Sequence, residues 1–177
     1  MLTTFLSSCD KGNAEDRIDV SKQWTIDNVG QISGTPIDDQ WHSKSFTPKE
    51  MSLFNSLDTV DLSGTTKPDN VFEPSGNYFF PNPFDYSQLS PPFHFNNNFS
   101  GDVVFKVIYT DNLLKPLFKA SIKLHATTIP STGASYSGTV AFLPTFPVGM
   151  FRVYYTLSAI DNPHFYKSWG NVQKVQF

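Results

Sequence analysis

The sequence contains little cysteine, little charge and no long apolar run. Its 177 residues include one Cys, which excludes an intrachain disulfide and a zinc site built from cysteines. Only 16% of the residues are charged and the formal net charge is −3, so a basic patch for nucleic acid is missing. No stretch approaches the ~20 consecutive apolar residues that a membrane-spanning helix needs. We therefore expect neither a disulfide framework, nor a nucleic-acid partner, nor a spanning helix within these residues.

Aromatic and turn-forming residues are abundant instead: 17 Phe, 7 Tyr and 3 Trp accompany 13 Pro and 10 Gly. This combination is typical of all-β domains, whose strands favour aromatic side chains and whose turns need Pro and Gly. Residues 103–109 are apolar on both faces, as in a central strand, and residues 117–124 alternate between apolar and polar side chains. Strands are expected over 77–80, 103–109, 117–124, 137–143, 149–157 and 171–177. A turn is expected at 161–163, and residues 169–171 are interpreted as a hairpin end that leads into the last strand. This pattern predicts an antiparallel, immunoglobulin-like β-sandwich of about seven strands.

One short N-terminal helix is predicted before these strands. Thr47 suits the N-cap, Pro48 suits the first helical position, and Glu50 stands three residues after the cap, which completes a capping box. The helix is expected to dock on an apolar surface through Met51, Phe54 and Leu57. The segment before the helix is mostly polar, so we expect chiefly a linker there, with a short strand near 23–26.

The single cysteine stands in a distinctive context. Leu6-Ser7-Ser8-Cys9 resembles a bacterial lipobox, in which small residues precede the cut and the cysteine thiol accepts a diacylglyceryl group. Two or three lipid chains on one residue anchor a protein stably, because each buried CH₂ contributes about 0.8 kcal/mol. The polar and acidic residues 10–16 resemble the export stretch of surface lipoproteins of Bacteroidota. The other interpretation is an incidental cysteine in a polar N-terminal segment.

The lipobox resemblance implies lipidation at Cys9 and a place in the cell envelope, as an outer-membrane lipoprotein exposed on the cell surface. The membrane is then a partner through the lipid anchor. Residues 1–8 contain no Lys or Arg, so we expect them to be only the last part of a signal. The expected organisation is a partial signal over 1–8, a polar tether over 9–45, the helix with an extended lead-in over 46–70, and the sandwich over 71–177.

Residues 78–84, Tyr-Phe-Phe-Pro-Asn-Pro-Phe, are similar to the opening of C-terminal sandwich modules that act as sorting tails in type IX secretion. Residues 103–119 and 146–157 are similar to later elements of these modules, with Leu114 in the place of a turn glycine. The two prolines of the motif fix φ and remove ladder donors, which ends a strand. The resemblance implies a sandwich over about the last hundred residues. It also implies a secretion or sorting module as the alternative function.

No motif for catalysis is evident. The four histidines lie far apart in the sequence and none has a metal-binding spacing: His42, His94, His125 and His164. A nucleophile elbow, a P-loop and a dinucleotide fingerprint are missing as well. We expect a protein that is not an enzyme, with no catalytic residues, no metal and no cofactor. An enzyme that uses His125 or His164 with carboxylates is the remaining alternative.

Two further signals bear on binding and modification. Phe165, Tyr166 and Trp169 lie close together in the sequence, and exposed aromatic faces of this kind stack on sugars in glycan-binding modules. The other interpretation is that these aromatics close one end of the core. Asp58-Thr59-Val60 resembles an O-glycosylation acceptor of exported Bacteroidota proteins, which marks Thr59. The sequence therefore favours a lipid-anchored envelope protein whose sandwich serves adhesion, scaffolding or accessory binding of a glycan or protein.

Overall fold

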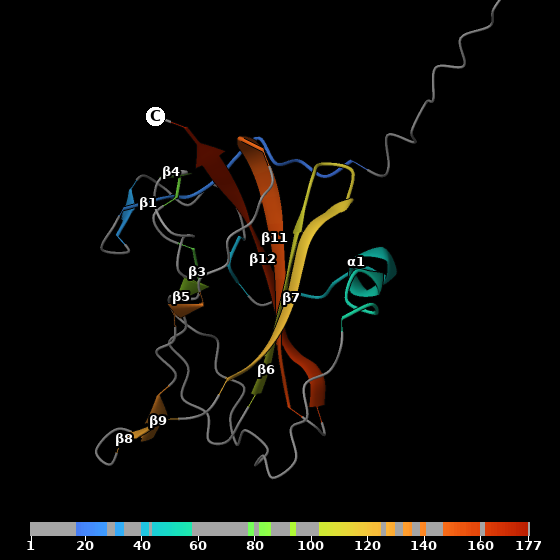
Figure 1. Ribbon diagram of the computed structural model, residues 1–177, viewed down its shortest axis with the longest axis vertical. Coiled ribbons are helices and arrows are strands. Elements are labelled where there is room, and N and C mark those ends of the chain that lie inside the picture. The colour runs from blue at the N-terminus through green and yellow to red at the C-terminus, as the bar shows by residue number, and fades with distance from the viewer. Residues whose placement is uncertain are drawn as a thin grey trace, which may run out of the picture.

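A computed structural model describes residues 17–27, 31–33, 40–42, 44–57, 78–79, 82–85, 93–94, 103–124, 127–129, 133–135, 139–140, 147–159 and 162–176 of the chain. Among them β-strands predominate and one short helix is present (Figure 1). The predicted class, mostly β with little helix, is therefore confirmed. No helix in the described part of the chain is long and apolar enough to cross a membrane.

A five-stranded sheet forms the centre of the fold. Its order is β4 (Phe84–Asp85), β12 (Asn162–Val175), β11 (Gly149–Ala159), β6 (Val103–Thr110) and β7 (Pro116–Leu124). Neighbouring strands run antiparallel, except that β4 is parallel to β12. Three smaller sheets are β10 (Thr139–Val140) with β5 (Phe93–His94) and β3 (Tyr78–Phe79), β1 (Thr25–Ile26) with β2 (Ile32–Ser33), and β8 (Thr127–Ile129) with β9 (Gly133–Ser135).

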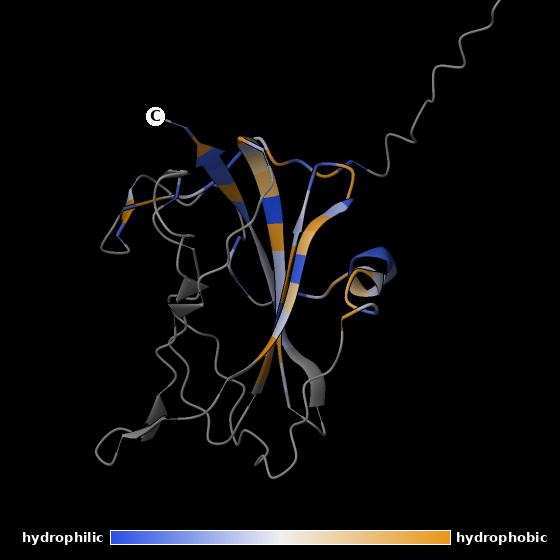
Figure 2. Cartoon of the chain, viewed as in Figure 1, coloured by the Kyte–Doolittle hydropathy of each residue, from blue (hydrophilic) through white to orange (hydrophobic). Residues whose placement is uncertain are grey.

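Hydrophobic patterning located the long strands β6, β7 and β11 to within two residues at each end. β6 is the central strand, between β11 and β7, and its residues 104–110 are all buried. β7 alternates as predicted, because Phe118 and Ile122 pack against the main core while Lys119 lies on the opposite face. Figure 2 shows the resulting bands of hydrophobic and hydrophilic residues along β7 and β11.

The last strand differs from its prediction. The sequence placed a turn at 161–163 and a hairpin end at 169–171, with the strand beginning at 171. In the structure one strand spans Asn162–Val175 and pairs with β11 along its length. Pro163 lies where the register of this pair shifts, so its missing N–H does not interrupt a regular ladder. The prediction of a hairpin end was wrong because Gly170, a turn former by type, is used here for close packing.

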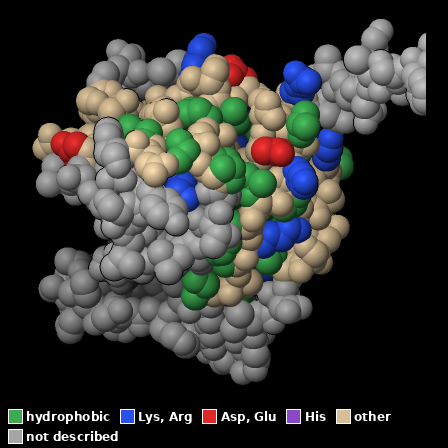
Figure 3. All heavy atoms as spheres, turned by 45° about the horizontal axis from the view of Figure 1, so that its top comes forward, with side chains coloured by type: hydrophobic (Ala, Val, Ile, Leu, Met, Phe, Trp, Pro, Cys, Tyr) green, Lys and Arg blue, Asp and Glu red, His purple; other side chains and the backbone are tan. Residues whose placement is uncertain are grey.

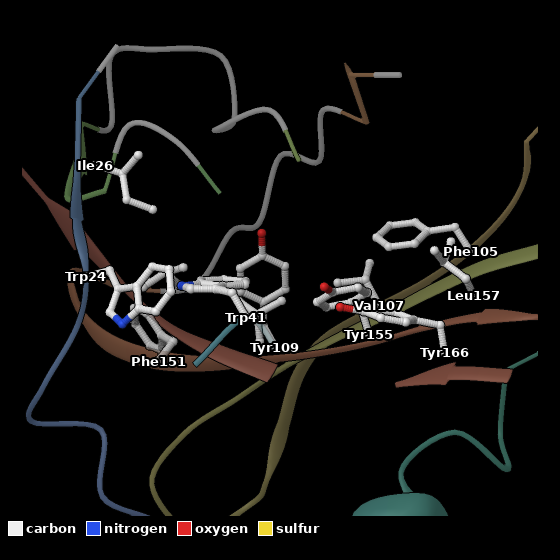
Figure 4. Close-up of a cluster of buried hydrophobic side chains, with 12 residues drawn as sticks. Trp24, Ile26, Trp41, Phe105, Val107, Tyr109, Phe151, Tyr155, Leu157 and Tyr166 are labelled. Atoms are coloured by element: carbon white, nitrogen blue, oxygen red, sulfur yellow. The ribbon is translucent and has the colours of Figure 1, made fainter. Parts of the chain in front are cut away.

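The main hydrophobic core covers one face of the five-stranded sheet. It consists of Trp24, Ile26, Trp41, Phe105, Val107, Tyr109, Phe151, Val153, Tyr155, Leu157, Tyr166 and Val172. Tyr155 and Tyr166 lie against each other with ring centroids 5.8 Å apart (Figure 4). Full burial of a large apolar side chain contributes roughly 1.5–3 kcal/mol, so this cluster is the principal source of stability in the described residues.

Part of the segment expected to be a polar tether, residues 9–45, belongs to this core. Three of its side chains are almost fully buried there: Trp24, Ile26 and Trp41. The backbone of Ile26 exchanges two hydrogen bonds with that of Asn82, at 2.9 and 2.8 Å. Nearer the N-terminus, the Ile18 N–H donates to the Asn112 carbonyl at 2.9 Å. The chain therefore already contacts the turn between β6 and β7 at Ile18.

A second, smaller cluster covers the opposite face of the sheet. The turns that follow α1 (Pro48–Ser52) place Leu53 and Phe54 against Ile108 and Tyr154 of the sheet. This is the docking surface expected for the helix, and Figure 1 shows α1 beside β7. The buried residues are Leu53 and Phe54, whereas Met51 is only half-buried.

The predicted capping box at the start of this helix is confirmed. Thr47 is the N-cap, and its hydroxyl accepts from the Glu50 N–H at 3.3 Å. The Glu50 carboxylate accepts in return from the Thr47 N–H at 2.7 Å. These bonds satisfy two of the N–H groups that a helix start leaves without intrahelical partners.

Candidate functional site

The candidate binding surface is a group of four residues that we call the Trp169 cluster: Trp169, Arg152, Lys44 and Lys167. Arg152 on β11 and Trp169 on β12 lie on the face of the sheet opposite the main core. The Arg152 Cζ lies 3.8 Å from the centroid of the Trp169 ring, and the Lys44 Nζ lies 5.2 Å from it. Such cation–π contacts contribute from about 0.5 kcal/mol when exposed to about 2 kcal/mol when desolvated.

Hydrogen bonds hold the buried Arg152 above the ring. Its Nε donates to Asn171 Oδ1 at 2.9 Å, and its Nη2 donates to the Asp19 carbonyl at 2.5 Å. Asn171 Nδ2 donates in turn to the Lys22 carbonyl at 2.6 Å. Gln40 Oε1 accepts from the Asn171 N–H at 2.7 Å. Because a buried guanidinium is costly without acceptors, these partners are what allow Arg152 to occupy this position.

The backbone beside β12 positions Trp169 and brings Lys44 to it. The Trp41 N–H donates to the Trp169 carbonyl at 2.7 Å, and the Lys44 N–H donates to the Lys167 carbonyl at 2.8 Å. These bonds occupy the edge of β12 that faces away from β11. Unpaired strand edges invite pairing with other chains, so the bonds also close an edge that would otherwise be exposed.

Asn82, from the Pro-Asn-Pro motif, continues this closure further along β12. Its Oδ1 accepts from the Gln173 N–H at 3.0 Å. Its Nδ2 donates to the carbonyls of Trp24 and Asn171, at 2.9 and 3.0 Å. The side-chain amide thus takes the place of a peptide group of a neighbouring strand. Although Asn82 is completely buried, its amide oxygen and nitrogen both have hydrogen-bond partners. β4, which follows directly, then pairs with β12 through its own backbone.

The Trp169 cluster contains three cations, and Glu50 is a carboxylate that acts on the neighbouring Tyr154. Burial raises the pKa of the neighbouring Tyr154 hydroxyl well above its usual range, so this group stays neutral at physiological pH. Hydrogen bonds from Ser21 lower the pKa of Asp19, whose exposed carboxylate accepts from the Ser21 N–H and hydroxyl. The Asp19 carboxylate is therefore engaged with Ser21, and only its carbonyl bonds to Arg152.

The structure separates the three aromatics predicted as a binding group. Tyr166 is 2% exposed and belongs to the main core, so it is not accessible to a ligand. Trp169 is half-buried on the opposite face, within the Trp169 cluster. Phe165 is part of β12, but its side chain lies outside the described residues. Cys9 and Thr59 also lie outside the described residues.

Among the residues that the structure describes, the histidines do not come together in one site. His42 is exposed and its ring packs edge-on against Trp24 at 5.8 Å between centroids. His94 and His164 belong to strands β5 and β12, and His125 lies outside the described residues. Among the residues that the structure describes, no group of three or more His, Cys, Asp or Glu could hold a metal ion.

Sequence reasoning missed Arg152, Lys44, Gln40 and Asn82 as parts of this region. Gln40 and Asn82 are distant in sequence from β12 and carry no local signal of their role. Arg152 had one available signal, because a single Arg within the otherwise apolar and hydroxylic stretch 149–157 requires a partner when the strand is buried.

The arrangement limits which ligands the Trp169 cluster can accept. A ring with a guanidinium stacked at 3.8 Å offers at most one open face, so it suits a flat stacking ligand poorly. Lys44 lies beside the ring, and Lys167 is two residues before Trp169 on the same face of β12. Both are half-exposed, which favours acidic groups over neutral ones. Comparisons of the chain with protein-family models, with curated proteins and with solved structures gave no match.

Proposed function

We propose that this chain is a lipid-anchored protein of the cell envelope, surface-exposed on the outer membrane, whose β domain is not catalytic. The domain serves adhesion, scaffolding or accessory binding of a glycan or an envelope protein. The observation that carries the proposal is the position of Cys9 in a lipobox-like sequence, eight residues before Arg17, where the described structure begins. The cysteine thus stands a short distance ahead of a folded domain, which is where an anchor is useful.

The strand order supports an immunoglobulin-like sandwich within this proposal. The hairpins β11–β12 and β6–β7 lie side by side in one sheet, in the order G, F, C, C′ of variable-type immunoglobulin domains. β3 belongs to the smaller sheet with β5 and β10, whereas β4 pairs with β12. We propose that β3 and β4 are two parts of one interrupted strand, with the Pro-Asn-Pro motif of residues 81–83 between them. Counted as one strand, β3 and β4 would bring these two sheets to about seven strands, in keeping with the proposed sandwich.

The turn between β6 and β7 also supports the resemblance to sandwich modules. Leu114, which stands in the place of their turn glycine, has a φ of 60°, in the left-handed region that favours glycine. Its side chain is buried in the second cluster with Ile108 and Tyr154. Leu114 thus adopts the backbone conformation of a turn glycine and also makes an apolar contact that glycine could not make.

The alternative function, a cleavable sorting module, predicts a cut near residue 70 that releases the C-terminal part. The packing favours the anchored protein instead. Residues ahead of that point supply Trp24 and Trp41 to the main core and Phe54 to the second cluster. A cut would separate these side chains from the sheet that buries them, with a loss of several large apolar contacts.

Replacement of the cysteine tests the anchor. Cys9→Ser is expected to move the protein from carbonate-washed membranes to the soluble fraction, because a hydroxyl cannot carry the thioether-linked lipid. Thr59→Ala, which removes the predicted glycosylation site, is the matched control and is expected to remain with the membranes. Membrane fractionation followed by immunoblotting measures both. A Cys9→Ser protein that stays in the washed membranes would contradict the anchor.

Charge reversal tests the binding surface. Lys44→Glu with Lys167→Glu is expected to lower affinity for dextran sulfate by about tenfold, from the loss of roughly one ion pair per side chain. Neutral dextran serves as the uncharged probe. Lys49→Glu with Lys115→Glu makes the same change in net charge elsewhere and is expected to leave the affinity nearly unchanged. Equal losses in both pairs, measured by calorimetry, would show general charge attraction and rule out the Trp169 cluster.

A further inference from the structure

We propose that the end of the five-stranded sheet that carries Leu113 and Val148 rests on the lipid bilayer to which Cys9 anchors the chain. The inference depends on the proposed lipid anchor and assigns it an orientation. The occupant of this surface is the headgroup region of the bilayer, where apolar side chains enter and cations meet lipid phosphates.

Two strongly exposed apolar residues lie at this end of the sheet. Among the described residues, three large hydrophobic side chains are strongly exposed: Ile32, Leu113 and Val148, at 37, 50 and 51%. Leu113 lies in the turn between β6 and β7, and Val148 directly precedes β11. Single exposed apolar residues are ordinary on a protein surface, so the significance lies in the shared location of Leu113 and Val148.

The strand register places Leu113 and Val148 at the same end of neighbouring strands. Thr110, the last residue of β6, is paired with Arg152 of β11. Beyond this pair, the chain continues from β6 to Leu113, and it enters β11 from Val148. The two antiparallel strands therefore leave the sheet side by side, at the end that Figure 1 shows uppermost.

The chain from Cys9 enters the domain at this same end. The Ile18 N–H donates to the carbonyl of Asn112, the residue next to Leu113. Residues 10–16 and the two flanking bonds span at most about 28 Å even when fully extended, at ~3.5 Å per residue. β11 alone has 11 residues and is about 37 Å long at ~3.4 Å per residue. With the strands upright on the bilayer, the opposite end of the sheet therefore cannot be the one that rests on it while Cys9 is embedded.

The charges around the apolar pair suit a phosphate-bearing surface. Arg17, Lys22 and Lys115 are exposed at this end. Asp111 is the nearby carboxylate of the turn, and it accepts from the N–H groups of Leu113 and Lys115, both at 2.9 Å. Figure 3 brings this end forward and shows Lys and Arg side chains beside hydrophobic ones on one surface. The cations are thus available to lipid headgroups, whereas the Asp111 carboxylate is engaged within the turn and that of Asp19 with Ser21.

Tryptophan scanning in vesicles tests the orientation. The lipidated full chain, carrying Leu113→Trp or Val148→Trp, is placed in vesicles of phosphatidylethanolamine and phosphatidylglycerol with or without brominated acyl chains. Asn55→Trp, exposed beside α1, is the matched control. We expect the added fluorescence at 113 and at 148 to fall severalfold in brominated vesicles. The emission of the control is expected to be unchanged.

The outcomes separate this inference from the anchor itself. Protein that floats with the vesicles but shows no quenching at either position, or equal quenching at the control, overturns the orientation and leaves the anchor standing. Protein that does not float with the vesicles overturns the anchor and the orientation together. Use of two separate positions guards against a variant that folds poorly, and near-ultraviolet circular dichroism verifies the fold of each.

Discussion

Asn82→Asp is expected to lower the free energy of unfolding at neutral pH by about 3–5 kcal/mol, the cost of an uncompensated buried charge. The new carboxylate still accepts from the Gln173 N–H. Its second oxygen, however, replaces a donor that now bonds to two carbonyls, those of Trp24 and Asn171. A negative charge would therefore face two acceptors at a position with no solvent exposure. Urea unfolding at pH 7 measures the loss.

The pH dependence gives this prediction a definite sign. Burial and the facing carbonyls raise the pKa of the introduced carboxyl in the folded state above its unfolded value. The deficit should therefore grow as the pH rises through the folded pKa, and should shrink toward pH 4 as the carboxyl binds a proton. Asn112→Asp, at an exposed asparagine, is the control and should change stability little at either pH. Equal effects of the two substitutions would contradict the bridging role of Asn82.

Gly170→Ala is expected to destabilise the domain by about 3 kcal/mol or more, as overpacking of a filled core does. A methyl group at Gly170 would overlap the ring of Trp41, which is buried against this position. The Trp41 ring cannot withdraw easily, because its backbone N–H is bonded to the Trp169 carbonyl. Thermal and urea unfolding of the single variant measure the effect.

A double-mutant cycle isolates the cause of this loss. Trp41→Ala alone is expected to cost about 3–5 kcal/mol, as deletion of a buried Trp side chain does. In that background, Gly170→Ala should cost less than about 1 kcal/mol, because the ring that it would strike is gone. Additive effects of the two substitutions would mean that the Trp41 ring does not lie over Gly170.

Local patterns predicted those parts of the fold that neighbouring residues determine. The alternation over 117–124 and the apolar run over 103–109 are properties of single strands, and both strands are present. The capping box at Thr47 needs only residues within one helical turn, and it forms as predicted. These features depend on contacts a few residues apart, which a linear sequence displays directly.

The remaining features depend on contacts between distant residues. Asn82 and Asn171 are 89 residues apart, and Gln40 and Asn171 are 131 apart. Nothing near Gln40 in the sequence indicates that its amide will satisfy a strand edge. The same reason explains the misjudged tether, since Trp24 and Trp41 are scattered apolar residues in a polar stretch until the sheet is present to bury them.

The candidate site shows why closeness in the sequence does not establish a shared surface. Phe165, Tyr166 and Trp169 were predicted as one binding group because they lie close together in the sequence. In a continuous strand, side chains three positions apart point to opposite faces. Tyr166 therefore enters the main core, while Trp169 faces the second cluster and stacks with Arg152.

Mass spectrometry of the protein isolated from its native envelope tests the central claim most directly. A lipid-anchored protein that is not cut should give an N-terminal peptide that begins at Cys9 and carries a diacylglyceryl group on its sulfur, in a chain that still extends through Phe177. An unmodified Cys9 thiol in that peptide, or a chain cut near residue 70, would contradict it.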